Sequence, residues 1–372
     1  WNQSVLLHAA QPLDLPALRR SLAALVARHD ALRLRYARAA DGRWTQDHAT
    51  LDARALDESL WLRQAHDAAG ITAICQQAQR SLDIEAGPLL RAVAIEVADG
   101  SARLLLAIHH LVVDGVSWRV LLQDLDEAYG QALAGQPPVL APRGGSYQDW
   151  ALALERHAPE RAGELEHWLA QRAAPALACA NPRGPATQRE RDSVEVRLGR
   201  ELTQALLQRA PAAYRSQVND LLLTALARAL CEAGGVPRVA IDLEGHGRED
   251  LFDDIDLSRT VGWFTTVYPV LLEPAGGPGE ALQRVKETLR AVPGRGLGHG
   301  LLKTMGTPAQ REALRAGARP QVLFNYLGQF DGSFGEQARW RPAAEAAGDE
   351  VHPDAALTHE FAVNGQVYEG EL

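Results

Sequence analysis

Two neighbouring histidines stand where a predicted strand gives way to a predicted helix. The segment His109–Gly115 (HHLVVDG) closes the apolar run Ala102–His109 and precedes Ser117–Ala132, whose apolar residues recur at helical spacing. Because side chains alternate along a strand, His109 and His110 point to opposite faces, so one ring can face a channel while the other packs. We take His110 as the reactive imidazole, a group that exchanges protons near neutral pH.

Two other roles compete for this histidine pair. A histidine at a strand end is more often a hydrogen-bonded structural residue than a catalytic one. A zinc site built from histidine and Asp114 is a further alternative, but opposite-facing neighbours do not easily reach one ion, and the spacing suggests no third ligand. We expect no metal, and the pattern alone leaves the structural alternative open.

A carboxylate motif follows the predicted strand Val239–Leu243. It reads EGHGRE, from Glu244 to Glu249, and by itself is typical of a solvated loop. Its alternating glycines allow the backbone to pass close to another surface. Two later segments mix aromatic and polar residues, Thr260–Pro269 and Phe324–Phe330, and core packing is the ordinary explanation for each. No single segment identifies a function.

The elements that must position these motifs fall into two series of strands and helices. A segment rich in Ala, Pro and Gly between them, residues 173–189, predicts a linker. A length of 372 residues is also more than one compact core usually holds. The expected strands are Asn2–Ala9, Leu32–Tyr36, Leu89–Val97, Ala102–His109, Val194–Leu198, Val239–Leu243, Val261–Leu272 and Gln321–Leu327, and the expected helices are Leu15–Leu32, Ile71–Leu82, Ser117–Ala132, Ser146–His157, Glu164–Ala170, Leu202–Ala210, Val218–Glu232 and Glu280–Ala291.

Composition excludes several classes of partner. The net charge of −9 and the pI near 5.8 argue against nucleic acid and against an anionic membrane surface. No apolar run is long enough to span a bilayer, and the first residues lack the pattern of a signal peptide. The three cysteines, Cys75, Cys179 and Cys231, are widely spaced and suggest neither a disulfide framework nor a metal site. We expect a cytoplasmic protein.

Taken together and in this order, the motifs resemble the condensation-domain superfamily of non-ribosomal peptide synthetases, and within it the epimerization domains. The HHxxxDG pattern alone marks only the superfamily. Its extension through Ser117-Trp118-Arg119 is similar to the epimerization form, and EGHGRE stands where condensing relatives usually carry a different loop ending in Asn-Arg. The matching segments are HHLVVDGVSWRVLLQDL (His109–Leu125), EGHGRE (Glu244–Glu249), TVGWFTTVYPV (Thr260–Val270) and FNYLGQFD (Phe324–Asp331).

The resemblance implies an α/β (α+β) fold of two chloramphenicol-acetyltransferase-like lobes, set in a V with a tunnel between them. With the predicted linker, the lobes would be residues 1–172 and 190–372. The resemblance also implies that side chains from both lobes carry out catalysis. Further residues at the site would have structural roles, and Asp114 would pair with Arg248. The expected catalytic residues are His110, Glu244, Asn325 and Tyr326, the structural ones His109, Asp114, Gly115 and Arg248, and the pocket-lining candidates Trp118, Trp263 and Phe264.

The implied activity is epimerization of the Cα of an aminoacyl or peptidyl thioester. His110 and Glu244 would remove and return the Cα proton on opposite faces, and Asn325 or Tyr326 would donate to the enolate oxygen. The phosphopantetheine arm would come from a peptidyl carrier protein domain, in the same polypeptide as adenylation and condensation domains, and no cofactor of its own is expected. The alternatives are a condensation domain or a CoA- or carrier-dependent acyltransferase, and an inactive carrier-docking module.

Two departures from the family pattern stand out. The family's PxxGxGYG motif has Tyr where His299 stands in Pro293–Gly300, which puts any role of that position in doubt. The opening PIQxWF motif is missing before Trp1, so we expect both ends of the domain to lie outside this chain. Glu369–Leu372 reads as the middle of a hairpin. The motifs do not identify the amino acid, the donor type, the final product or the oligomeric state.

Overall fold

The computed structural model describes residues 1–9, 11–51, 53–142, 144–178, 186–329 and 338–372. The elements confirm a mixed α/β fold. The strands are β1 (Asn2–Ala9), β2 (Leu34–Arg38), β3 (Trp44–His48), β4 (Leu60–Ala65), β5 (Leu90–Val97), β6 (Ala102–His109), β7 (Val239–Gly245), β8 (Thr266–Leu272), β9 (Val322–Gln329), β10 (Trp340–Pro342) and β11 (Phe361–Val367). The helices are α1 (Leu15–Arg28), α2 (Ala53–Ser59), α3 (Ala68–Gln79), α4 (Gly115–Leu133), α5 (Tyr147–His157), α6 (Leu165–Ala170), α7 (Arg200–Gln204), α8 (Ala210–Tyr214), α9 (Val218–Gly234), α10 (Pro278–Arg290), α11 (Leu297–Met305) and α12 (Pro308–Ala316).

Contacts within the chain divide it into two compact units, and each unit is discontinuous in sequence. Unit 1 comprises Trp1–Trp150, Phe252–Phe264 and the described part of Gly332–His352, and unit 2 comprises the remaining described residues. The division therefore differs from two continuous lobes joined by a linker, because two segments from the second half of the sequence pack with the first. Residues 179–185 of the expected linker lie outside the described residues.

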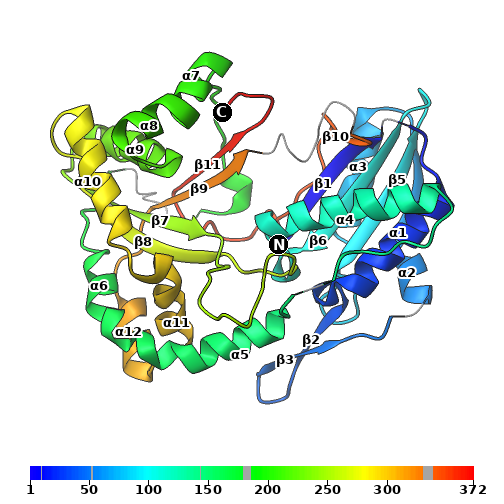
Figure 1. Cartoon of the computed structure of the whole chain (residues 1–372), viewed down its shortest axis with the longest axis horizontal. Helices are drawn as coiled ribbons and strands as arrows, with labels where there is room; N and C mark the ends of the chain where they lie inside the picture. Colours follow the sequence, from blue (N-terminus) through cyan, green and yellow to red (C-terminus); the bar gives the residue numbers. More distant parts are fainter. Residues whose placement is uncertain (10, 52, 143, 179–185, 330–337) are drawn as a thin grey trace. The chain divides into compact units, whose positions relative to one another are not determined.

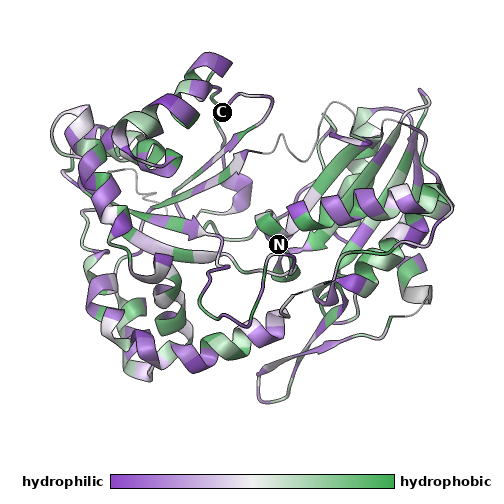
Figure 2. Ribbon diagram, in the orientation of Figure 1, coloured by the Kyte–Doolittle hydropathy of each residue, from purple (hydrophilic) through white to green (hydrophobic). Residues whose placement is uncertain are grey.

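Unit 1 is built on a five-stranded sheet in the order β10-β1-β6-β5-β4. Strand alternation along β6 sorts its apolar side chains onto two faces. Leu104 and Leu106 pack with α1 and α4, whereas Leu105 packs with α3 on the opposite face. In Figure 1 the orange β10, from late in the chain, lies beside the blue β1, and Figure 2 shows hydrophobic colour along the central strands of this sheet. Each fully buried leucine contributes about 1.5–3 kcal/mol.

Unit 2 is built on a four-stranded sheet in the order β11-β9-β7-β8, in which β9 runs parallel to both β7 and β11. Helices α9 and α10 cover one face and pack on Ile241 of β7 and Phe324 of β9. Strand β8 is at the edge of this sheet, and α11 and Trp168 of α6 pack against it. An edge strand covered in this way is not open to pairing with another chain. The His299 ring donates from Nδ1 to Val267 O at 3.0 Å, and Leu271 N donates to Gln171 Oε1 at 3.0 Å.

The structure corrects two predicted strands. Val194–Leu198 alternates apolar and polar residues but forms no strand: Val194 and Val196 are 87% and 75% exposed, and Leu198 makes one backbone hydrogen bond, to Leu372 O. The predicted strand Val261–Leu272 begins only at Thr266. Residues 261–264 form no strand because side chains of unit 1 bind their backbone groups.

Other predictions agree closely with the structure. The predicted strand Asn2–Ala9 matches β1. The predicted strands Leu89–Val97 and Ala102–His109 match the antiparallel β5 and β6, which are joined by a turn at Asp99-Gly100. Cys75 is a buried core residue, and burial raises the pKa of its thiol to about 11. Cys179 lies outside the described residues. Tyr368 and Glu371 pair across the turn Glu369-Gly370, so the expected hairpin turn is present.

Candidate active site

The His110 ring is held in unit 1 by contacts on three sides. His110 begins a short 3-10 turn (η2, His110–Val112) directly after β6. Its Nδ1 lies 2.9 Å from Val113 O, and its Nε2 lies 3.1 Å from Gln3 Nε2 on β1. The ring of Trp263 lies against it, with centroids 4.5 Å apart. The orientation of this imidazole is therefore set before any substrate binds.

His109 plays a different part from its neighbour. Its Nδ1 accepts a hydrogen bond from Leu111 N at 3.2 Å, which caps the 3-10 turn. Burial is the main cause that lowers the pKa of His109 to about 4, and the positive charge at the amino terminus of Trp1 adds to it. A ring that stays neutral and accepts from the backbone is suited to the structural role expected of His109.

Asp114 joins the start of α4 to the segment 260–264. It is the N-cap of α4, and its Oδ1 accepts from Ser117 N at 2.8 Å. Its Oδ2 accepts from Phe264 N at 3.0 Å, and the carboxylate is 1% exposed. A capping carboxylate that also binds a distant backbone donor fixes both segments together.

Ser117 adds a second link to the same segment. Its hydroxyl donates to Gly262 O at 2.9 Å and accepts from Gly262 N at 3.1 Å. A Cβ at Gly262 would stand 2.4 Å from the Tyr147 ring, so no larger residue fits there without movement. These hydrogen bonds use the backbone groups that a strand would have given to a neighbour, which explains why β8 begins late.

The remaining candidate site residues of unit 1 differ in how deeply they are buried. Gly115 is the first residue of α4. Trp118 is 6% exposed and belongs to the core of unit 1, and Phe264 is 5% exposed with its ring 4.9 Å from that of Tyr147. Trp263 is partly buried and contacts the His110 ring. Of the three pocket-lining candidates, the structure brings Trp263 into contact with the candidate catalytic residue His110.

Glu244 is the second-to-last residue of β7 in unit 2. Val239, Ile241 and Leu243 point into the core beneath α9 and α10, so Glu244 points to the other face of the sheet. Within unit 2, the described residues offer its carboxylate no hydrogen bond. Burial raises the pKa of Glu244, and the positive charge of His359 opposes that rise in part. A carboxylate in this state is suited to exchanging protons closer to neutral pH.

The register of β9 separates the two candidate enolate donors. Leu243 pairs with Phe324 in the parallel sheet, so Asn325 follows on the same face as Glu244, one strand away. Tyr326 follows on the opposite face and packs against the core of unit 2, where burial raises the pKa of its phenol. Strand alternation therefore brings Asn325, and not Tyr326, to the face of Glu244. Phe330 and Asp331 of this motif lie outside the described residues.

The rest of the EGHGRE motif is a loop with its own internal bonds. His246 Nδ1 accepts from Arg248 N at 3.0 Å, and its Nε2 lies 3.4 Å from Glu249 Oε1. Glu249 also pairs with Arg295 at 3.4 Å, which ties the loop to the segment before α11. The expected pairing of Arg248 with Asp114 stays a prediction.

The comparison with protein families agrees with this set of motifs. A family model described as the condensation domain matches residues 1–372. The chain belongs to the condensation-domain family.

Curated relatives of this condensation-family chain are far longer than the chain itself. A linear gramicidin synthase protein from Brevibacillus parabrevis is 43% identical over 385 residues, covering 100% of this chain and 7% of the relative. Surfactin synthase subunit 1 from Bacillus subtilis (strain 168) is 36% identical over 382 residues, covering 100% of this chain and 11% of the relative. The chain thus spans a small part of large synthase proteins.

Solved structures separate one similar domain from more distant ones. The epimerization domain from the third module of tyrocidine synthetase B matches with a TM-score of 0.90 and 34% identity, covering 100% of this chain and 85% of that chain. The X-domain from teicoplanin biosynthesis matches with a TM-score of 0.70 and 23% identity, covering 95% of this chain and 79% of that chain. The second likeness shows a shared fold alone.

Sequence reasoning missed an ion pair close to Glu244 in this condensation-family chain. Asp242 lies two residues before Glu244 on the same face of β7, and His359 Nε2 lies 2.9 Å from its Oδ2. Both side chains are mostly buried, at 15% and 12% exposure. The alternation in Val239–Glu244 could have revealed Asp242, because it places two acids on one strand face. No sequence signal indicates His359.

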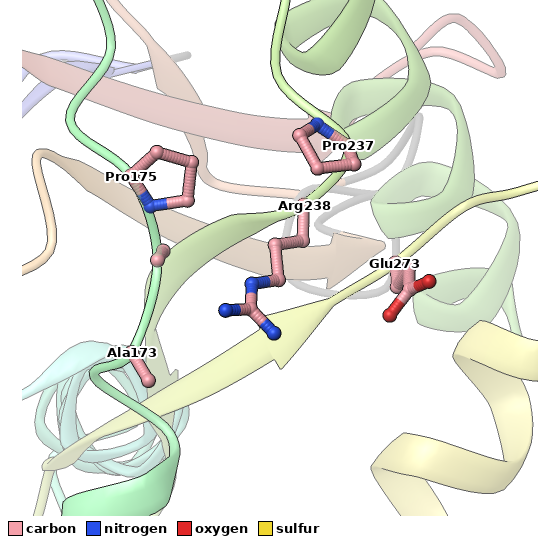
Figure 3. Close-up of a pocket in the computed structure, with 6 residues that line it drawn as sticks. Ala173, Pro175, Pro237, Arg238 and Glu273 are labelled. Atoms are coloured by element: carbon pink, nitrogen blue, oxygen red, sulfur yellow. The ribbon is translucent and has the colours of Figure 1, made fainter.

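A pocket in unit 2 lies apart from this carboxylate. Pro175, Pro237, Arg238 and Glu273 line it, and Figure 3 shows these side chains around the opening. Arg238 immediately precedes β7, whereas Glu244 stands near its other end, about 20 Å away at 3.3 Å per residue. This pocket therefore does not contain Glu244.

Neither a membrane-spanning helix nor a metal-binding cluster is present among the described residues. No helix among them is long and apolar enough to cross a membrane. No three of their His, Cys, Asp or Glu side chains are grouped so as to hold a metal ion.

Proposed function

We propose that this condensation-family domain epimerizes the Cα of an aminoacyl or peptidyl thioester, from L to D, in non-ribosomal peptide synthesis. The observation that carries the proposal is Glu244, a largely buried carboxylate with a raised pKa near the end of β7. A site that only condenses an amine with a thioester has no need of a second proton-transfer group of this kind. The likeness of the whole chain to an epimerization domain supports the same assignment.

The reaction consists of two proton transfers at one carbon. A base takes the Cα proton, the C–H bond breaks, and its electron pair passes into the thioester carbonyl to form an enolate. An acid on the opposite face then gives a proton to Cα, and the carbonyl is restored. We assign these two positions to His110 and Glu244, and Asn325 is our first choice to donate a hydrogen bond to the enolate oxygen.

The substrate is attached to a carrier protein in this proposal. The phosphopantetheine arm of a peptidyl carrier domain presents the thioester, so the chain needs no diffusible cofactor for the proton transfers. The small share of the synthase proteins that the chain spans leaves room for adenylation, condensation and carrier domains in the same polypeptide.

One assay tests the activity directly. The domain is incubated with a carrier protein loaded with an L-aminoacyl or L-peptidyl thioester, the thioester is hydrolysed, and the product is separated by chiral chromatography. We expect a mixture of L and D forms, with solvent deuterium incorporated at Cα. Peptide-bond formation with an added aminoacyl carrier, without any D product, would instead indicate a condensation domain. Carrier binding with neither reaction would indicate an inactive docking module.

A further inference from the structure

The hydrogen bonds of His110 define which ring nitrogen carries the proton. Nδ1 lies 2.9 Å from Val113 O. A carbonyl oxygen can only accept, so Nδ1 donates and must be protonated. In the neutral ring the basic lone pair is then on Nε2, which lies 3.1 Å from the side-chain nitrogen of Gln3.

The orientation of the Gln3 amide follows from a separate contact. Gln3 Oε1 lies 3.0 Å from Nε1 of Trp118. An indole N–H can only donate, so the amide oxygen must face Trp118 and the amide nitrogen must face His110. Trp118 itself is buried in the core of unit 1, which holds its N–H in place. The amide therefore donates to Nε2, in agreement with the tautomer derived from Val113.

The four groups form a chain of hydrogen bonds with one direction. Trp118 donates to Gln3, Gln3 donates to His110, and His110 donates to Val113. If Nε2 gained a proton, its N–H would face the N–H of Gln3, and two donors would oppose each other. Turning the amide over would relieve this conflict but would place its nitrogen against the Trp118 N–H. Every bond in the chain is satisfied only while Nε2 is unprotonated.

We propose that Gln3, oriented by Trp118, is a positioning residue that keeps the basic lone pair of His110 on Nε2. The inference rests on the proposed function, in which His110 exchanges a proton with Cα. During that step the Gln3 amide leaves Nε2, the Cα–H bond breaks as the Nε2–H bond forms, and the electron pair enters the enolate. When Nε2 gives its proton to solvent, or to Cα in the reverse reaction, the amide returns and restores the starting tautomer.

The first test reads the tautomer in the wild-type protein. With 15N-labelled histidine, long-range 1H–15N spectra above neutral pH report which nitrogen of each ring is protonated, and the His110 signal is assigned by its absence from His110→Gln. We expect a protonated Nδ1 and an unprotonated Nε2. A proton on Nε2 with none on Nδ1 would overturn the proposal, whatever the activity of the enzyme.

The second test is the isosteric change Gln3→Glu. A carboxylate still accepts from Trp118 but has no proton to donate, so His110 must protonate Nε2 to bond with it. We expect the spectrum to show a protonated Nε2, and the exchange rate at Cα to fall by about 10²–10⁴-fold in kcat with little change in KM, the range of general acid–base catalysis. Wild-type exchange in the folded Gln3→Glu protein would contradict the assignment.

Two further variants make the tests selective. Gln46→Glu introduces the same charge on the exposed strand β3 of unit 1 and should change neither spectrum nor rate. Trp118→Phe removes the indole donor, so the amide can turn over and its oxygen can accept from Nε2 while Nδ1 still donates to Val113. We expect part of the Nε2 signal to become protonated in that variant, and an Nε2 signal identical to wild type counts against the role of Trp118. Absence of exchange in the wild-type protein would contradict the proposed function. The spectra would still show whether Gln3 determines which nitrogen of His110 is protonated.

Discussion

The two candidate proton-transfer groups are controlled by different physics. His110 of unit 1 has hydrogen-bond partners at both ring nitrogens and an aromatic ring against its face. Glu244 of unit 2 receives no hydrogen bond from the described residues of its own unit, and its ionisation responds to burial and to the charge of His359. Hydrogen bonds define a tautomer, whereas burial and charge move a pKa.

This difference has a consequence for mutagenesis. In a chain of hydrogen bonds with one direction, replacing one donor atom by an acceptor breaks the pattern. Isosteric changes such as Gln3→Glu should therefore strongly lower the exchange rate at Cα. A carboxylate governed by burial and long-range charge should respond in a graded way, visible as a displaced pH profile.

Loss of either group should remove Cα exchange. We expect His110→Ala and Glu244→Gln each to lower solvent deuterium incorporation by about 10²–10⁴-fold, because each removes one of the two proton-transfer groups. Mass spectrometry of the hydrolysed product measures the incorporation. His66 is exposed and directly follows β4, so His66→Gln serves as the matched control and should exchange like wild type. Exchange at the wild-type rate in either His110→Ala or Glu244→Gln would contradict the assignment of that residue.

Removal of Asp114 should destabilise unit 1 more than removal of an ordinary helix cap. Asp114 binds the donors of Ser117 and Phe264, whereas Asp14, the N-cap of α1, binds that of Ala17. We expect Asp114→Ala to lower the free energy of unfolding by about 2–4 kcal/mol and Asp14→Ala by about 1 kcal/mol. Denaturant titration measures both values. Equal losses would show that the bond to Phe264 contributes little.

Removal of the His359 charge should displace the pH profile of exchange. His359 lowers the pKa of Glu244 against the rise caused by burial, so His359→Gln should raise that pKa. In the direction in which Glu244 removes the Cα proton it must be ionised, so the acid limb of the exchange rate in that direction should move to higher pH, with a few-fold loss of rate on that limb. Rates measured across the acid limb test this, and His359→Arg, which keeps a cation beside Asp242, should restore the profile. An unchanged acid limb in His359→Gln would show that His359 does not affect the pKa of Glu244.

The smallest effect concerns stability. Because the folded-state pKa of Glu244 is raised, its protonated form favours the folded state, and that contribution is lost as the pH rises through the folded-state pKa. Glu244→Gln cannot lose it, so we expect a Tm a few degrees above wild type at alkaline pH and a smaller difference at acid pH. Glu312→Gln, on the exposed surface of α12, should show no such pH dependence. Thermal melts over a pH series decide the sign.

Local patterns alone predicted most of the elements that carry the motifs. The strand Asn2–Ala9 and the helix Ser117–Ala132 were predicted from the residues of each segment and from the spacing of their apolar side chains. The motifs themselves, read in order, were enough to predict the family that the comparison confirms. These features depend on residues close together in sequence, where side-chain period and backbone preference decide the outcome.

Only the tertiary structure shows which distant residues bind one another. Residues 260–264 look like a strand in sequence, but Asp114 and Ser117, almost 150 positions away, bind their backbone groups instead. Gln3 meets His110 only because β1 pairs with β6, and His359 meets Asp242 only because its segment reaches the face of β7. A hydrogen bond or ion pair between distant residues leaves no periodic trace in the sequence, so only the folded chain shows it.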